Sequence, residues 1–431
     1  MAHAVMTIID ELEWRGMVSD CTDTEALTKK LSEDTVTLYC GFDPTSDSLH
    51  VGNLVPLLAL RRFQLFGHHP IALAGGATGS IGDPSGKSVE RNLLSKAAIK
   101  SNIDQVSKQL AKFLDFDADS NPAKLVNNAD WTAQISFLDF LRDVGKHFSV
   151  NKMVAKESVR ARMEDREVGI SYTEFSYMLL QAFDFYHLCE ANDCLLQIGG
   201  ADQWGNITAG IELCHKKLRR QAYGLTLPLI TNADGSKFGK SEAGAIWLDA
   251  EKTSVYKFYQ FWIRTDDRDV VRYLRYFTFL SQEEIASLAK SHEEDPGRRE
   301  AHRALAKHMT EMIHSEHATA EAERATQVLF GGSINEISEA SFEDITAEIP
   351  SVRLERSRFE ADGIGLIDLF VEAGLANSKG QARKDIQGGG ANVNNVRETE
   401  IDRQLTETDL LFNKYLLLRK GKRNYTAVTV Q

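Results

Sequence analysis

The chain has 431 residues and a mass of 48.1 kDa, more than one compact core normally holds, and its length predicts about three domains. Hydrophobic residues make up 42% and charged residues 26%, which excludes a largely disordered chain, and no apolar run approaches the roughly 18 residues of a membrane span. The net charge is −12, the five cysteines form no C-x-x-C pair, and the acidic N-terminal segment is unlike a secretory signal. We therefore expect a cytoplasmic protein with no disulfide framework, zinc site or membrane anchor.

Short strands alternate with helices through the first half of the chain. Strands are expected at residues 36–40, 70–74, 124–127, 195–198 and 225–231. Helices are expected between them at residues 54–66, 95–114, 135–143, 173–189 and 205–217. Such alternation is typical of parallel pairing. The predicted fold class is therefore α/β, with a Rossmann-like open parallel sheet whose ligands bind at the carboxyl ends of the strands.

The strand pattern stops near residue 254, and the rest of the chain is organised differently. Helical patterns continue to about residue 329, weak signals follow, and a small α+β unit starts at residue 364. We therefore expect a sheet domain at 1–250, an α-helical domain at 251–330, a linker at 331–363 and a small α+β domain at 364–431. The last domain carries a net charge of +2 in an otherwise acidic chain, which weakly favours contact with RNA.

The tetrapeptide His50-Val51-Gly52-Asn53 stands between the first strand and the helix at 54–66. An imidazole and a carboxamide are thereby placed at a helix N-terminus, where free N–H groups and the macrodipole attract anions. Gly52 has no side chain, so a flat ring could lie against its backbone. The alternative is that His50 and Asn53 only cap the helix.

A glycine-rich loop follows the second strand at residues 74–88. A phosphate-binding P-loop would need a glycine five positions before Gly86-Lys87-Ser88, and this position is Ile81. The spacing therefore argues against a P-loop kinase. What remains is a loop carrying Asp83, Lys87 and Arg91, which could equally be a solvated turn.

The helix at 173–189 carries Tyr177, Gln181 and Asp184 on one face, at positions i, i+4 and i+7. Three polar groups in an otherwise apolar helix would be costly to bury without partners, which suggests that a ligand contacts them. An exposed polar stripe on an amphipathic helix is the alternative.

A loop with two lysines, Lys237-Phe238-Gly239-Lys240-Ser241, follows the last predicted strand. Two positive charges among glycines can close over a polyphosphate and stabilise charge that develops on a leaving group. Taken alone, such a loop is more often a simple surface loop.

Together, these motifs resemble those of class I aminoacyl-tRNA synthetases, which pair a helix-start His–Gly motif with a K-x-x-K-S loop. The chain is similar to bacterial tyrosyl-tRNA synthetases in particular, and the likeness covers essentially its whole length. The segments that carry it are Leu38–Thr45, the Gly75–Ser88 loop, Thr173–Tyr177, Gln197–Asn206 and Lys237–Ser241. The tail from Gly363 resembles the S4-type RNA-binding domain.

The resemblance implies that the chain joins tyrosine to ATP as tyrosyl-adenylate and then transfers tyrosine to the 3′ end of tRNA(Tyr). Tyr39 and Asp184 would read the substrate phenol, and a ligand without the hydroxyl would leave both unpaired. The matched tyrosine-binding residues are Tyr39, Asp83, Tyr177, Gln181, Asp184 and Gln203.

The resemblance also implies an ATP site in which catalysis consists of positioning and charge stabilisation, with Mg²⁺ bound through the phosphates. The matched ATP-binding residues are Cys40, Asp43, His50, Gly52, Asn53, Gly200, Asp202 and Lys240. The matched catalytic residues are Thr45, His50, Asn53, Lys237, Lys240 and Ser241. Asn53 stands where the family motif has His and can still donate a hydrogen bond from its amide. Ser241 replaces Thr and keeps the hydroxyl.

Further partners are implied for the tail and for the whole chain. The matched RNA-binding residues are Lys379, Arg383, Lys384, Lys420, Lys422 and Arg423. The helical domain would lie nearer the anticodon, and the family is a homodimer with tRNA crossing between subunits. Two rival readings stay open at this point: a tryptophan-specific synthetase of the same fold and a non-catalytic RNA-binding protein.

Overall fold

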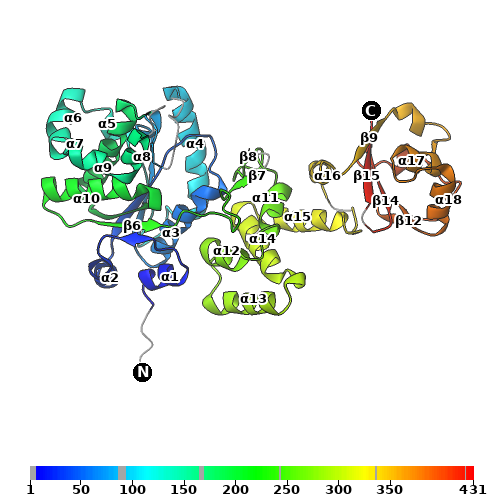
Figure 1. The fold of residues 1–431 in the computed structure, drawn as a ribbon, viewed down its shortest axis with the longest axis horizontal. Helices are drawn as coiled ribbons and strands as arrows, with labels where there is room; N and C mark the ends of the chain where they lie inside the picture. Colours follow the sequence, from blue (N-terminus) through cyan, green and yellow to red (C-terminus); the bar gives the residue numbers. More distant parts are fainter. Residues whose placement is uncertain (1–5, 86–93, 165–168, 242–243, 335–336, 423) are drawn as a thin grey trace. The chain divides into compact units, whose positions relative to one another are not determined.

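The computed structural model describes residues 6–85, 94–164, 169–241, 244–334, 337–422 and 424–431 (Figure 1). The chain divides into two compact units. The first contains the residues up to 249 together with 266–301, and the second contains 250–265 together with 302–431. Among the described residues, no helix is long and apolar enough to cross a membrane.

The first unit is built on a six-stranded sheet with the strand order β1-β6-β5-β2-β3-β4. Its strands are β1 (Asp20–Cys21), β2 (Thr37–Phe42), β3 (His69–Ala74), β4 (Lys124–Asn127), β5 (Cys194–Gly200) and β6 (Tyr223–Leu227). All neighbours pair in parallel except β1, which is antiparallel to β6. In the centre, Tyr39 of β2 lies opposite Ile71 of β3 and Gln197 of β5. The predicted α/β class with a parallel sheet is confirmed.

The first unit also contains helices: some pack against this sheet, and others lie outside it, including those in the segment 266–301. They are α1 (Ile8–Trp14), α2 (Thr24–Glu33), α3 (Leu54–Leu65), α4 (Lys96–Phe113), α5 (Ala129–Thr132), α6 (Phe137–Asp143), α7 (Val150–Val154), α8 (Glu157–Glu164), α9 (Tyr172–Asn192), α10 (Trp204–Leu218), α12 (Val270–Phe277) and α13 (Gln282–Glu294). Helices α9 and α10 lie side by side (Figure 1), and their residues Phe185, Leu188 and Cys214 pack with Tyr39 in one core cluster. Helix α3 is buried along most of its length and packs on β2 and β3.

Short 3-10 helices and one small hairpin complete the first unit. The 3-10 helices are η1 (Val51–Asn53), η2 (Thr78–Ser80), η3 (Gly145–His147), η4 (Ala201–Gln203) and η5 (Pro296–Arg298). The hairpin pairs β7 (Lys240–Ser241) with β8 (Gly244–Ala245) in antiparallel fashion.

The second unit combines helices with an α+β tail. Its helices are α11 (Val255–Ile263), α14 (Glu300–Ile313), which begins at the boundary, α15 (Glu316–Val328), α16 (Glu339–Thr346), α17 (Leu366–Glu372) and α18 (Lys379–Gln387), with the 3-10 helices η6 (Arg356–Phe359) and η7 (Glu407–Asp409). Its strands are β9 (Ser351–Leu354), β10 (Ile364–Gly365), β11 (Ala391–Val393), β12 (Val396–Glu398), β13 (Gln404–Leu405), β14 (Tyr415–Lys420) and β15 (Asn424–Val430). Five of them form a sheet in the order β12-β11-β14-β15-β9, and β10 pairs with β13.

Two details differ from the predicted elements. The strand expected at 225–231 starts at Tyr223 and ends at Leu227, because its parallel partner β5 ends at Gly200 and offers no further pairing. The segment expected as a linker contains α16 and β9, and β9 pairs in parallel with β15. Phe342 and Ile345 of α16 are fully buried with Tyr415 and Leu417. The four-part division of the chain stays a prediction.

Candidate active site

A cavity of about 720 Å³ lies at the carboxyl ends of the parallel strands. It lies where the strand order reverses, because β2 has β3 on one side and β5 on the other. This point of an open α/β sheet is where ligands bind, because the loops leaving neighbouring strands diverge there. Residues at the ends of β2 and β5, the loop after β3 and helix α9 form its wall.

Most of the predicted site residues are in this wall. They are Tyr39, Cys40, Asp43, Thr45, His50, Asn53, Asp83, Tyr177, Gln181, Asp184, Gly200, Asp202 and Gln203. Four predicted residues lie outside the wall as the described residues define it: Gly52, Lys237, Lys240 and Ser241. Lys87 and Arg91 of the glycine-rich loop lie outside the described residues.

The deep end of the cavity holds the phenol of Tyr39, which is 1% exposed. Its hydroxyl oxygen has no hydrogen-bond partner among the described residues, and neither does the side-chain oxygen of Gln197 on the adjacent strand. Burial, together with the nearby Asp184, raises the pKa of Tyr39 well above its ordinary value. The phenol is therefore neutral, and an unpaired buried hydroxyl at a cavity wall indicates a place for a polar ligand atom.

Asp184 of α9 is held at the same end by two donors that come from beyond β4. The side-chain amide of Asn128 donates to one carboxylate oxygen at 2.9 Å, and the indole N–H of Trp131 donates to the other at 2.8 Å. Burial raises the pKa of the Asp184 carboxyl to about 7, although both hydrogen bonds act in the opposite direction. Asp184 thus carries an oriented carboxylate whose charge depends on pH near neutrality.

A second carboxylate, Asp43, follows β2 and joins α9 to the loop after β3. The hydroxyl of Tyr177 donates to it at 2.8 Å, and the hydroxyl of Thr78 donates to its other oxygen at 2.7 Å. Asn128 donates to Thr78 at 3.0 Å, so the network runs from Asp184 to Tyr177. A side chain at Gly75 would meet the Asp43 carboxylate at 2.0 Å, so glycine is required there.

The remaining polar wall is formed by amides around Asp83. Gln203 donates to its carboxylate at 2.6 Å, and the backbone N–H of Ser85 donates to the second oxygen at 2.9 Å. Asn206, which is buried on α10, donates to Gln181 at 3.0 Å and to Gln203 at 3.3 Å. These contacts bring Asp83, Gln181 and Gln203 together from three separate segments.

The His50–Asn53 turn is a capped 3-10 helix, η1, directly before α3. The Nδ1 atom of His50 accepts from the backbone N–H of Gly52 at 3.0 Å, and the Asn53 side chain accepts from the backbone N–H of His50 at 3.1 Å. Both residues also line the cavity, so capping and contact with the cavity occur together. A Cβ atom at Gly52 would lie 2.8 Å from the His50 ring, which is too close, so only glycine lets the ring adopt this position.

The two-lysine loop lies beside this turn. Val51 donates its backbone N–H to Ile246 at 3.0 Å, and a Cβ atom at Gly239 would lie 2.7 Å from the Val51 side chain. Gly239 also has a φ of +77°, a value that favours glycine. Lys237 and Lys240 are exposed, and the side chain of Ser241 lies outside the described part of the chain. The fold thus brings a loop some 190 residues further along the chain next to the helix start.

Sequence reasoning did not find Asn128, Trp131, Thr78 and Asn206, which orient the predicted residues. A signal existed for Asn128 and Trp131, because they follow the predicted strand at 124–127 at its carboxyl end, where an open α/β sheet places its functional residues. Thr78 and Asn206 lie inside the segments that resemble the family, but no pattern in the sequence distinguished them from the other short polar residues there.

The basic residues of the tail lie on α18 and at the turn between β14 and β15, and a backbone hydrogen bond joins these two segments. Gly421, in the turn between β14 and β15, donates its backbone N–H to Gly390, which follows α18, at 2.8 Å. Arg383, Lys384 and Lys422 are exposed. Lys379 forms an ion pair with Asp368 at 2.6 Å, and Lys420 forms one with Asp385 at 2.7 Å. The predicted residue Arg423 lies outside the described residues.

Two family models match the chain. The model described as "tRNA synthetases class I (W and Y)" matches residues 31–331, and the model described as "Tyrosine--tRNA ligase SYY-like C-terminal domain" matches residues 341–428. Together with the parallel sheet and the cavity at its switch point, the first match defines the class: the chain is a class I aminoacyl-tRNA synthetase.

Individual relatives narrow this class. The tyrosine–tRNA ligase of Opitutus terrae is 60% identical over 99% of this chain and 100% of its own length. That of Roseiflexus castenholzii is 54% identical over 97% of this chain and 98% of its own length. The structure of a C-terminally truncated mitochondrial tyrosyl-tRNA synthetase from Aspergillus nidulans is 32% identical, covers 76% of this chain and 95% of its own, and superposes with a TM-score of 0.69. The chain belongs to the tyrosine–tRNA ligases, which activate L-tyrosine with ATP and transfer it to the 3′ end of tRNA(Tyr). The tryptophan-specific and non-catalytic alternatives are thereby set aside.

Proposed function

We propose that the deep end of the cavity is the side-chain pocket for the substrate tyrosine, with Tyr39 and Asp184 binding its hydroxyl. The observation that supports this role is the buried Tyr39 hydroxyl, which has no partner among the described residues and lines the cavity with the oriented Asp184 carboxylate. A substrate phenol would donate to Asp184 and pair with Tyr39. Phenylalanine would leave both groups buried without that partner, at a cost of about 1–3 kcal/mol for each group.

The amino-acid end of the substrate is assigned to the polar wall above this pocket. Asp83, Tyr177 and Gln181 would hold the α-ammonium group, and Gln203 would lie near the carboxylate. Asp83 supplies a negative charge, and Tyr177 and Gln181 project from α9 toward the same cavity as Asp184. The hydrogen bonds of Asp83 and Gln181 to amide donors fix their acceptor atoms before the substrate arrives.

The nucleotide is assigned to the remaining wall and the two motif segments. The residues proposed to bind ATP are Cys40, Asp43, His50, Gly52, Asn53, Gly200, Asp202 and Lys240, and those proposed to act in catalysis are Thr45, His50, Asn53, Lys237, Lys240 and Ser241. The substrate carboxylate attacks the α-phosphorus and pyrophosphate leaves, so no protein side chain needs to act as a nucleophile. The contribution of these residues is therefore positioning and stabilisation of the charge that develops on the phosphates.

Mg²⁺ is proposed to enter with ATP, bound through the phosphates. The carboxylates of the cavity wall already accept hydrogen bonds: Asp43 from Thr78 and Tyr177, and Asp83 from Gln203 and Ser85. We therefore assign no protein ligand to the ion. Its chemistry would be to neutralise charge on the β- and γ-phosphates.

The pocket assignment is tested by amino-acid-dependent exchange of pyrophosphate into ATP, measured with tyrosine, phenylalanine and tryptophan. Tyr39→Phe is expected to raise the KM for tyrosine about tenfold and to leave the KM for ATP unchanged, because one buried hydrogen bond is lost. Thr45→Ala serves as the matched control, because Thr45 lies at the exposed nucleotide side of the same cavity and is expected to lower kcat at constant KM for tyrosine. An unchanged preference for tyrosine over phenylalanine in Tyr39→Phe would contradict the role given to Tyr39.

We further propose a homodimer that associates through an exposed apolar face. This face is formed by side chains of α6, α7, α8 and α9: Phe137, Leu138, Val150, Met163 and Tyr172, exposed by 65%, 75%, 61%, 53% and 66%. Other residues of these four helices share one buried cluster, which keeps the helices together. Large apolar side chains gathered on a monomer surface are typical of an interface.

The tail is proposed to contact tRNA(Tyr) through Lys379, Arg383, Lys384, Lys420, Lys422 and Arg423, and the helical segment 251–330 to lie nearer the anticodon. The exposed Arg383, Lys384 and Lys422 support this role, since they carry charge toward solvent. Lys379 and Lys420 would first have to leave their aspartate partners. A cytoplasmic location is proposed because charged tRNA is consumed where translation takes place.

A further inference from the structure

The two-lysine loop rests on helix α12 through an aromatic contact. The ring of Phe238, between the two lysines, stacks on Phe277 with ring centres 5.1 Å apart and an interplanar angle of 16°. It also meets Tyr273 edge to face at 5.1 Å, and Tyr273 packs against Phe277 at 5.7 Å. Tyr273 and Phe277 are buried and belong to successive turns of α12. The backbone between the two lysines is therefore anchored by one side chain.

The chain that enters the loop is bound to the same helix by polar contacts. The hydroxyl of Tyr273 donates to the side chain of Asn232 at 3.0 Å, and the backbone N–H of Ala233 donates to Asp269 at 2.7 Å. Arg272 donates to the carbonyl of Thr231 at 2.8 Å. Helix α12 thus acts as a platform that holds the loop at its entrance and at Phe238.

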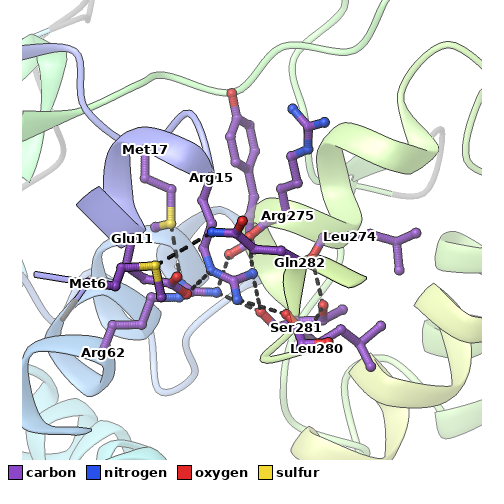
Figure 2. A network of polar contacts seen from close by, with 12 residues as sticks. Met6, Glu11, Arg15, Met17, Arg62, Leu274, Arg275, Leu280, Ser281 and Gln282 are labelled. Carbon is purple, nitrogen blue, oxygen red and sulfur yellow. Dashed lines mark hydrogen bonds and ion pairs between the residues drawn. The ribbon is translucent and has the colours of Figure 1, made fainter. Parts of the chain in front are cut away.

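The C-terminal end of this platform, next to Phe277, is held by two buried arginines, Arg15 beside α1 and Arg62 of α3 (Figure 2). Their guanidinium groups converge on the carbonyl oxygen of Thr278, at 3.0 Å from Arg15 and 2.7 Å from Arg62. Arg15 also donates to the carbonyls of Arg275 and Leu280, each at 2.9 Å, and Arg62 donates to that of Tyr276 at 3.2 Å. These oxygens lie at and beyond the C-terminus of α12, where helix carbonyls need outside donors.

Arg15 and Arg62 bring two positive charges into a buried site. Glu11 forms an ion pair with Arg15 at 2.5 Å and compensates one of the two buried positive charges. Burial, together with the neighbouring Arg15, lowers the pKa of Arg62 to about 9, so Arg62 still carries its charge at neutral pH. Arg62 belongs to α3, the helix that begins directly after the His50–Asn53 turn. One helix therefore connects the nucleotide-side turn to the platform of the lysine loop.

We propose that Phe238 is a positioning residue for Lys237 and Lys240, and that Arg15 and Arg62 hold its platform α12 in register with α3. The inference rests on the proposed catalytic role of the two lysines and adds the device that places them. Each lysine is exposed and has a long flexible side chain, so the backbone anchor between them determines where both charges can act.

The test is a set of double-mutant cycles on adenylate formation, measured as single-turnover rates with saturating tyrosine and varied ATP. Phe238→Ala is combined with Lys237→Ala and, separately, with Lys240→Ala. Phe238→Ala alone is expected to slow adenylate formation roughly tenfold to a hundredfold, because misplaced charges lose much of their effect. Its Kd for tyrosine, measured by equilibrium dialysis, is expected to stay within about twofold of the parent value, because Phe238 lies outside the tyrosine pocket.

Coupling separates positioning from a general loss of structure. If Phe238 acts through the lysines, Phe238→Ala should slow the enzyme far less once Lys237 or Lys240 is already alanine. Phe412→Ala is the matched control, because this partly exposed phenylalanine packs against Phe342 in the tail and should leave the rate unchanged. Arg62→Lys, which keeps the charge but loses the forked donors, should reproduce the Phe238→Ala effect in weaker form.

Each outcome has a distinct meaning. Normal rates in both single lysine variants would overturn the proposed role of the lysines and with it this inference. Two outcomes in which the lysine variants are slow would overturn the positioning role alone. In the first, Phe238→Ala slows adenylate formation by the same factor in the lysine variants as in the parent. In the second, Phe238→Ala does not change the rate. A normal rate in Arg62→Lys would overturn the role given to the arginines. If Arg62→Lys does not fold, Arg15→Lys tests the same role, because Arg15 donates to the same end of α12.

Discussion

At the scale of single residues, the site depends on where burial leaves polar atoms paired or unpaired. Asp184 is buried with a donor at each carboxylate oxygen, while the nearby Tyr39 hydroxyl has no partner among the described residues. This difference suits the site to a polar ligand, because the Asp184 carboxylate is already oriented and the neutral Tyr39 hydroxyl can still form a hydrogen bond. Asn128 and Trp131 thus orient Asp184, and under the proposed assignment they would act on tyrosine binding without touching tyrosine.

Tyrosine binding should depend on pH through Asp184. Burial raises the pKa of this carboxyl to about 7, so the group is ionised above that pH and protonated below it. An ionised carboxylate is the better acceptor for the substrate phenol, so binding should be tight above pH 7 and weaken as the pH falls through 7. At pH 6 the KM for tyrosine is expected to be roughly tenfold higher than at pH 8.

Asp184→Asn provides the comparison, measured by pyrophosphate exchange from pH 6 to pH 8. The amide cannot ionise, so the KM of this variant for tyrosine should be higher than that of the parent at pH 8 and nearly constant across the pH range. A parent-like slope in Asp184→Asn would assign the pH dependence to another group.

At the scale of elements, helix α9 carries Tyr177, Gln181 and Asp184, so its start must be well defined. Ser171 and Glu174 form a capping box there, and Glu174 also binds the buried Arg162 of α8 through two bonds of 2.8 and 2.9 Å. The same arginine donates to the carbonyl of Gly169 at 2.8 Å. One buried ion pair thus joins α8 to the first turn of the helix that supplies Tyr177, Gln181 and Asp184 to the cavity wall.

Removing one partner of this pair should be costly. Arg162→Met would leave the Glu174 carboxylate buried without its cation, and we expect a loss of about 3–5 kcal/mol in the free energy of unfolding, measured by urea denaturation at fixed protein concentration. Lys152→Met removes a largely exposed lysine from its ion pair with the partly exposed Glu212, and it should cost less than about 1 kcal/mol. Equal losses in the two variants would contradict the weight given to burial.

At the scale of the whole molecule, the proposed dimer and the proposed tRNA contact use different surfaces. The apolar face of α6–α9 belongs to the sheet unit, and the basic residues of α18 and the β14–β15 turn belong to the tail. Association should therefore be separable from tRNA binding by substitution.

Leu138→Glu combined with Val150→Glu is expected to convert the dimer to monomer, because two charges would be buried at a contact that requires apolar surface. Analytical ultracentrifugation gives the mass directly. Val396→Glu, at another exposed apolar side chain, should leave the mass unchanged. A parent enzyme that is already monomeric at micromolar concentration would refute the dimer.

Arg383→Glu combined with Lys384→Glu should raise the KM for tRNA and spare pyrophosphate exchange, because the substitutions change charge only in the tail. The salt dependence of tRNA binding should also become weaker, since fewer phosphate contacts release fewer counterions. Reversing two exposed lysines of the sheet unit, Lys29 and Lys112, is the charge-matched control. Equal changes in both double variants would point to net charge instead of a specific contact.

Periodicity and motif spacing in the sequence were sufficient to predict three features: the parallel sheet, the helix that carries Tyr177, Gln181 and Asp184, and the two motif segments at 50–53 and 237–241. These features follow from short-range pattern: alternation within a strand, the helical repeat, and glycines where side chains would clash. They need no knowledge of which distant residues meet.

Only the tertiary structure decided that Asn128 and Trp131 hold Asp184, that β9 joins the sheet of the tail, and that α12 carries the lysine loop. Each of these contacts joins segments far apart in the chain, and their own sequences contain no local signal for the partner. Their geometry is determined by the order of strands in the sheet and by the packing of buried side chains, which a single linear pattern does not encode.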